Sequence, residues 1–146
     1  MILSNLFAPI AADMKALDAE IRARLDSEVV LIRTIGEYIV GAGGKRMRPA
    51  VLMLVAKALG YQGTYHHVLA AVVEFIHTAT LLHDDVVDES DLRRGRSTAN
   101  AVFGNAASVL VGDYLYSRSF EMMVETGLMQ AMAVLSAATT VIAEGE

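Results

Sequence analysis

Three aspartates follow a long apolar segment of the sequence, at positions 84, 85 and 88. On a helix Asp84 and Asp88 lie one turn apart on the same face, and Asp85 flanks them. Like charges at this spacing repel each other, so an apolar helix gains nothing from them unless a cation lies between the carboxylates. Carboxylate oxygens suit Mg²⁺, which leaves its other coordination positions to water and phosphate oxygens. The cluster predicts a magnesium site; the alternative is a solvated helix end, where acidic residues are common.

A glycine-rich turn at residues 41–44 leads into three cations, Lys45, Arg46 and Arg48, which precede Pro49 at the start of an expected helix. Backbone N–H groups, the helix dipole and the cationic side chains converge there, as an anion-binding site requires. The spacing excludes a mononucleotide-binding loop of the Walker type, because Arg46 stands where serine or threonine would be needed. The segment predicts a phosphate site, although an ordinary helix connection with exposed charges remains open.

A second basic cluster, Arg93, Arg94 and Arg96, begins five residues after Asp88. Arginine guanidinium groups match phosphate oxygens in a bidentate manner, so cations beside a metal-binding acidic cluster indicate a polyanion that bridges the two. Alternatively, the arginines only neutralise the acidic residues that precede them. Two cationic segments around one carboxylate cluster predict two phosphorylated ligands held side by side.

Helices must position these residues, because the sequence has few alternating β-branched runs and only two prolines. Apolar residues recur at helical spacing, and glycines interrupt the pattern. We expect an all-α antiparallel bundle formed by a single domain over residues 1–146. The expected helices span residues 10–25, 27–38, 49–60 and 64–89; a basic loop at 91–97 then leads to a short helix and two apolar helices separated near Gly127.

Composition limits the function further. The formal net charge of −5 argues against nonspecific nucleic-acid binding, and the lack of cysteine excludes thiolate metal sites. No secretory signal is recognisable, which predicts a cytoplasmic protein. The uncharged stretch 126–143 is long enough to span a membrane, but its polar side chains favour a buried bundle helix instead.

These motifs match a known family. The sequence resembles the trans-isoprenyl diphosphate synthases, most closely those of the bacterial long-chain (octaprenyl) type. The resemblance extends over essentially the whole chain and rests on Gly-Gly-Lys-Arg-x-Arg-Pro at residues 43–49, Asp-Asp-x-x-Asp at 84–88 and Arg-Arg-Gly at 93–95.

The resemblance implies two neighbouring diphosphate sites. Mg²⁺ bound by Asp84, Asp85 and Asp88 would bridge the allylic diphosphate, which Arg93 would also hold. The diphosphate of isopentenyl diphosphate would be held by Lys45, Arg48, His77 and Arg94. On a helix His77 lies two turns before Asp84 on nearly the same face, which is compatible with adjacent sites. Taken alone, His77 is more typical of a hydrogen-bonded histidine between helices.

The resemblance also implies a reaction. Magnesium and arginines would stabilise the departing pyrophosphate, so that an allylic substrate such as farnesyl diphosphate ionises and the isopentenyl double bond attacks it. Aromatic residues one turn before the aspartates limit product length in this family, whereas here Ala79 and Thr80 are small. A long-chain product is therefore expected. Because members of this family are homodimers, the resemblance also implies a homodimer.

The chain departs from the family in one respect. No second aspartate-rich motif follows Asp113, so we expect an amino-terminal, truncated portion of the synthase that is inactive by itself. The alternatives are a noncatalytic subunit of a heteromeric prenyltransferase, a shorter-chain farnesyl or geranylgeranyl diphosphate synthase, and a helical interaction module. Head-to-head synthases, which also carry aspartate-rich helices, lack the glycine-lysine-arginine segment.

Overall fold

The computed structural model describes residues 2–145, and it describes the side chains of residues 5–145. The chain is almost entirely helical, which confirms the expected all-α bundle. Its elements are α1 (Ile2–Phe7), a 3-10 turn η1 (Ala8–Ile10), α2 (Ala11–Arg24), α3 (Val30–Gly41), α4 (Met47–Ala58), α5 (Tyr65–Val87), β1 (Leu92–Arg93), β2 (Arg96–Ser97), α6 (Ala99–Phe103), α7 (Asn105–Thr126) and α8 (Met129–Glu144).

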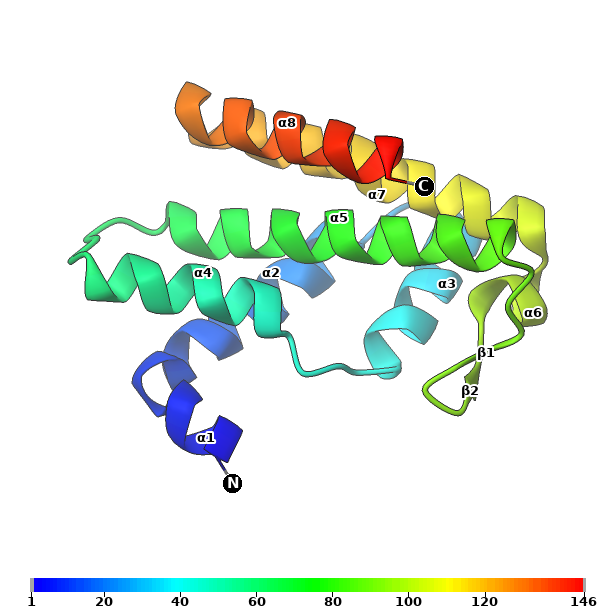
Figure 1. Ribbon diagram of the computed structural model, residues 1–146, viewed down its shortest axis with the longest axis horizontal. Coiled ribbons are helices and arrows are strands. Elements are labelled where there is room, and N and C mark those ends of the chain that lie inside the picture. Colours follow the sequence, from blue (N-terminus) through cyan, green and yellow to red (C-terminus); the bar gives the residue numbers. More distant parts are fainter. Residues whose placement is uncertain (1, 146) are drawn as a thin grey trace.

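The centre of the bundle is the pair formed by α5 and α7, which run antiparallel (Figure 1). Both helices contribute side chains to one apolar core, to which α2, α3 and α4 add residues from the other side of α5. The core includes Val72, Phe75 and Ile76 of α5 and Leu115 and Met122 of α7. Burial of the apolar side chains of α5 fixes the rotation of this helix about its axis. It therefore also fixes the directions of the polar side chains near the end of α5.

Helix α8 lies along α7 (Figure 1) and makes most of the segment 126–143 helical as expected, but within the described residues none of the side chains of α8 is buried. The prediction of a buried helix is therefore wrong for this chain, because α8 packs mainly against α7 and leaves residues such as Val134 and Val141 exposed. No helix in residues 2–145 is both long and apolar enough to cross a membrane.

The segment predicted as a basic loop is a short β-hairpin, the only strand pair in the described part of the chain. Leu92 pairs with Ser97 and Arg93 with Arg96. The two residues between the strands, Arg94 and Gly95, have φ of 53° and 75°. Positive φ at both positions is the mark of the tight hairpin turn whose twist matches that of the strands. The turn was missed because arginine is uncommon in this conformation.

Replacement of Gly112 by alanine is expected to destabilise the bundle. A Cβ atom at Gly112 would overlap the imidazole ring of His83 on α5, so α5 and α7 would have to separate or the ring would have to leave its place. Overpacking of this kind costs about 1–3 kcal/mol of unfolding free energy. Gly41→Ala is the matched control, because no atom lies within 4 Å of a Cβ at that position. Urea unfolding measures the free energy of unfolding of both variants. An equal loss of this free energy in Gly112→Ala and Gly41→Ala would contradict the prediction.

Candidate functional site

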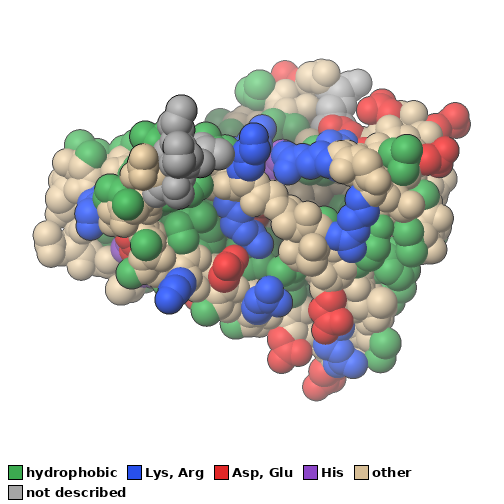
Figure 2. Space-filling view, turned by 90° about the horizontal axis from the view of Figure 1, so that it is seen from below, with side chains coloured by type: hydrophobic (Ala, Val, Ile, Leu, Met, Phe, Trp, Pro, Cys, Tyr) green, Lys and Arg blue, Asp and Glu red, His purple; other side chains and the backbone are tan. Residues whose placement is uncertain are grey.

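A cavity of about 410 Å³ lies between α5, the end of α3, the turn that follows α3, and the hairpin. Figure 2 shows basic side chains gathered around a hollow on this face of the molecule. Six cations line the cavity against two carboxylates, Glu74 and Asp85; the cations are Lys45, Arg46, Arg48, Arg93, Arg94 and Arg96. The excess of positive charge suits an anionic ligand, as the two basic segments predicted.

The glycine turn brings the two basic segments together. Gly43 and Gly44 have φ of 67° and 153°, which bend the chain sharply after α3. A side-chain carbon at Gly44 would lie 3.7 Å from Nη1 of Arg94, so the hairpin arginine lies against the bare backbone of the turn. Cations at residues 45–48 and 93–96 therefore line one cavity although they are far apart in the sequence.

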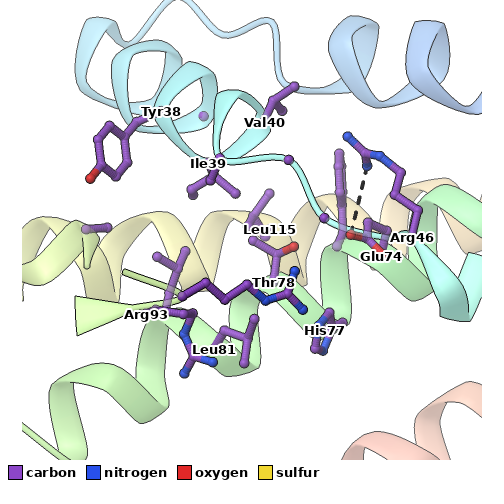
Figure 3. A pocket seen from close by; sticks show the side chains of 18 of the residues that line it. Tyr38, Ile39, Val40, Arg46, Glu74, His77, Thr78, Leu81, Arg93 and Leu115 are labelled. Carbon is purple, nitrogen blue, oxygen red and sulfur yellow. Dashed lines mark ion pairs between the residues drawn. The ribbon is translucent and has the colours of Figure 1, made fainter. Parts of the chain in front are cut away.

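Arg46 and Arg96 both have structural partners within the protein. Arg46 lies 3.4 Å from Asp18 and 3.9 Å from Glu74 (Figure 3), and burial raises the pKa of Glu74, while Arg46 opposes this. Arg96 stacks on the ring of Tyr38 with its guanidinium 3.9 Å from the ring centroid. The Tyr38 hydroxyl donates a hydrogen bond of 2.6 Å to the carbonyl of Ser97, which ties α3 to the hairpin. Sequence motifs indicated none of these contacts.

His77, Thr78 and Leu81 of α5 line the cavity (Figure 3). Nη1 of Arg48 lies 3.4 Å from Nε2 of His77. Burial, followed by the charges of Arg48, Arg93 and Arg94, lowers the pKa of His77 below 6.5. We therefore assign a neutral imidazole to His77, whose Nε2 accepts a hydrogen bond from Arg48. This hydrogen bond orients the guanidinium group of Arg48 at the cavity wall.

The protonation of His77 should make the fold sensitive to acid. Because the pKa is lower in the folded chain, unfolded His77 takes up its proton at higher pH, and the free energy of unfolding falls as the pH drops below 6.5. An NMR titration of the imidazole should give a pKa below 6.5, and Arg48→Gln should raise it partway, since burial remains. A pKa of 6.5 or above in the unaltered chain would contradict this.

The end of α5 presents its aspartates on two adjacent stripes. Asp84 and Asp88 continue the stripe of His77 and Leu81, because these residues are separated by three or four positions. Asp85 is buried and faces the cavity. Nη2 and Nε of Arg93 donate to its two carboxylate oxygens at 2.6 and 3.1 Å. This hydrogen-bonded pair raises the pKa of Arg93, and the charges of the aspartates add to the effect.

Asp84 and Asp88 fit a divalent cation better than Asp85 does. Among residues 5–145 neither forms an ion pair, whereas both oxygens of Asp85 are occupied by Arg93. Asp84 is half-buried in the last turn of α5 and Asp88 is its C-cap. Carboxylates at the negative end of a helix dipole repel each other and the dipole, and a cation between them offsets both effects.

Ala79 and Thr80 do not line this cavity. Ala79 is fully buried in the core. The hydroxyl of Thr80 lies 3.0 Å from that of Tyr116 on α7 and donates to the carbonyl of Ile76 at 2.9 Å. Both residues thus lie on sides of α5 that face away from this cavity, and Tyr116 is a bulky neighbour of Thr80 that the sequence did not indicate.

A known protein family and several relatives match this chain. The polyprenyl synthetase family matches residues 29–146. The octaprenyl diphosphate synthase of Escherichia coli is 59% identical over 146 residues, which are all of this chain and 45% of that enzyme. The decaprenyl diphosphate synthase of Rhodobacter capsulatus, a solved structure, superimposes with a TM-score of 0.93 at 52% identity, over 98% of this chain and 44% of that one.

A third relative adds a liganded structure. The polyprenyl synthase of Caulobacter crescentus, solved in complex with calcium and isoprenyl diphosphate, superimposes with a TM-score of 0.95 at 48% identity. The match covers 98% of this chain and 44% of the Caulobacter crescentus chain. The chain thus spans slightly less than half the length of the relatives it resembles.

Proposed function

Because this chain belongs to the polyprenyl synthetase family, we propose that it supplies the diphosphate-binding half of a prenyltransferase that extends an allylic diphosphate with isopentenyl diphosphate. The observation that carries the proposal is the cavity of six cations along α5, the helix whose end carries two aspartates without ion-pair partners in the described residues. An ordinary connection between helices does not need cations from two distant segments around one hollow.

The side chains divide into three groups by their contacts. Asp84 and Asp88 would hold Mg²⁺, which would supply positive charge for the leaving diphosphate of the allylic substrate. Asp85 fixes Arg93 so that the remaining N–H groups of its guanidinium can donate to the same diphosphate. Lys45, Arg48 and Arg94, with His77 behind Arg48, bind the diphosphate of isopentenyl diphosphate. The solved relative with calcium and isoprenyl diphosphate supports a divalent cation beside such a ligand.

The product we propose is a long-chain polyprenyl diphosphate of the octaprenyl type, with farnesyl diphosphate as a suitable primer. Apolar walls must exclude water, because an allylic cation would otherwise be quenched. This chain alone is proposed to be inactive, since no second aspartate-rich motif follows Asp113. The homodimer, for which the exposed apolar residues of α7 and α8 offer a surface, and the cytoplasmic location remain predictions.

Calorimetric titration of the chain with methylene bisphosphonate tests the diphosphate site without requiring catalysis. We expect binding that needs Mg²⁺ and that weakens in Arg48→Gln and Arg94→Gln. Arg22→Gln is the control, because Arg22 is an exposed arginine of α2 outside the cavity. Equal bisphosphonate affinity with and without Mg²⁺ would contradict the proposal. So would a loss of affinity in Arg22→Gln as large as that in Arg48→Gln and Arg94→Gln.

A further inference from the structure

Three potential metal ligands meet at the end of α5 opposite to the aspartates. Oδ1 of Asp13 on α2 lies 3.1 Å from Nε2 of His66 and 2.6 Å from Nε2 of His67. The two imidazole rings lie with their centroids 4.0 Å apart. All three side chains are half-buried, and one ligand atom from each lies within 4.8 Å of the others. His66 and Asp84 are 18 positions apart, which places this cluster about 27 Å along α5 from the carboxylates of the cavity.

We propose that Asp13, His66 and His67 form a separate site for a transition-metal cation of the Zn²⁺ class. Two imidazole nitrogens and one carboxylate oxygen are typical ligands of Zn²⁺, and three protein ligands leave a coordination position for water. Hard cations such as Mg²⁺ prefer oxygen ligands throughout, so the two ends of α5 should select different metals. Unlike the carboxylates near the cavity, this cluster contains no arginine or lysine that would repel a cation.

The three ligand atoms are hydrogen-bonded to one another. Asp13 accepts from both Nε2 atoms, so each Nε2 carries the proton that it donates. A cation bound at Nε2 requires each neutral imidazole to hold its proton at Nδ1 instead, so metal binding replaces the two hydrogen bonds of the cluster. The three ligand atoms already lie within 4.8 Å of one another, which is close enough for them to share one cation.

One atom limits the affinity. Nδ1 of His66 is buried and has no hydrogen-bond partner among the described residues. A histidine ligand usually donates its second N–H to an acceptor, and loss of such a partner weakens metal binding about 10–100-fold. We therefore expect a weaker site than one in which this N–H had an acceptor. Because Asp13 lies on α2 and both histidines lie on α5, a bound metal would link these two helices.

The test titrates the 146-residue chain with Co²⁺ in excess Mg²⁺, which occupies the hard-cation carboxylates, and then displaces Co²⁺ with Zn²⁺. We expect one equivalent of Co²⁺ with visible d–d absorption, and at least about tenfold weaker binding in His67→Gln and Asp13→Asn. Asp113→Asn is the control: it removes a carboxylate 3.3 Å from His83, in a pair with only two ligands. Its Co²⁺ affinity should be unchanged.

Nitrogen NMR of the unaltered chain gives a second readout that does not depend on the variants' folding. Zn²⁺ should shift the Nε2 resonances of His66 and His67 and leave that of His83 in place. Unchanged resonances at His66 and His67 would overturn the proposal and leave a purely hydrogen-bonded cluster. Co²⁺ binding to His67→Gln as tight as that to the unaltered chain would overturn it as well.

Discussion

Replacement of Asp84 and Asp88 together by asparagine should abolish prenyl transfer. The measurement needs a complete enzyme, for which a hybrid is suitable: this chain replaces the matching 146 residues of the E. coli synthase, to which it is 59% identical. Asparagine keeps the size of the side chains but removes the charges that hold Mg²⁺. Incorporation of labelled isopentenyl diphosphate with farnesyl diphosphate should fall about 10³-fold or more, because loss of one group that stabilises developing charge already costs about 10²–10³.

The same substitutions should leave the fold intact, since Asp88 is exposed, Asp84 is half-buried, and neither has an ion-pair partner among residues 5–145. Circular dichroism checks this. Asp91→Asn is the matched control, because it removes an exposed carboxylate just beyond α5 and should retain full turnover. Activity of the double variant within a few-fold of the hybrid would exclude Asp84 and Asp88 as the metal site. Loss of activity in Asp91→Asn as well would indicate a nonspecific effect of charge.

The sequence predicted the helical class from local patterns, whereas the meeting of its charged segments was inferred from their shared chemistry, since cations beside carboxylates suit a phosphorylated ligand with a metal ion. Helical spacing of apolar residues set the face of α5, and the same spacing placed Asp84 and Asp88 on one stripe with His77. Gly43 and Gly44 marked the sharp turn because only glycine adopts their φ values at little cost. These features follow from residues that are close together in the chain.

The missing features depend on contacts between distant residues. The Asp13–His66–His67 cluster joins residues more than fifty positions apart, and the sequence offers no periodicity that would pair them. Likewise, nothing in the Asp-Asp-x-x-Asp spacing shows that Asp85 is buried against Arg93 while its neighbours are not. The resemblance assigned the same role to all three aspartates, whereas their contacts separate one that positions an arginine from two that remain available to a cation.

The second large effect concerns product length, and the structure selects the residue that tests it. Ala79→Phe is a poor test, because Ala79 is fully buried and a phenyl ring there would destabilise the core by about 1–3 kcal/mol or more. Thr80 is half-buried, on the flank of the stripe that carries Asp84, and its hydroxyl meets that of Tyr116. A tail that leaves a diphosphate at Asp84 and Asp88 and runs back along this flank would pass beside the Thr80–Tyr116 pair.

Thr80→Phe in the hybrid should therefore shorten the main product by several isoprene units while prenyl transfer continues, because the ring closes the path but touches no diphosphate ligand. Thr80→Val is the control: it keeps the shape of the side chain and removes only the hydrogen bonds of the hydroxyl to Tyr116 and to the carbonyl of Ile76, each worth about 1 kcal/mol. Chromatography of the dephosphorylated products distinguishes the two. If Thr80→Phe makes products as long as those of Thr80→Val, the tail runs elsewhere, and the cavity between α5, the turn after α3 and the hairpin becomes the path to examine, with Phe75 and Leu115 as its apolar end.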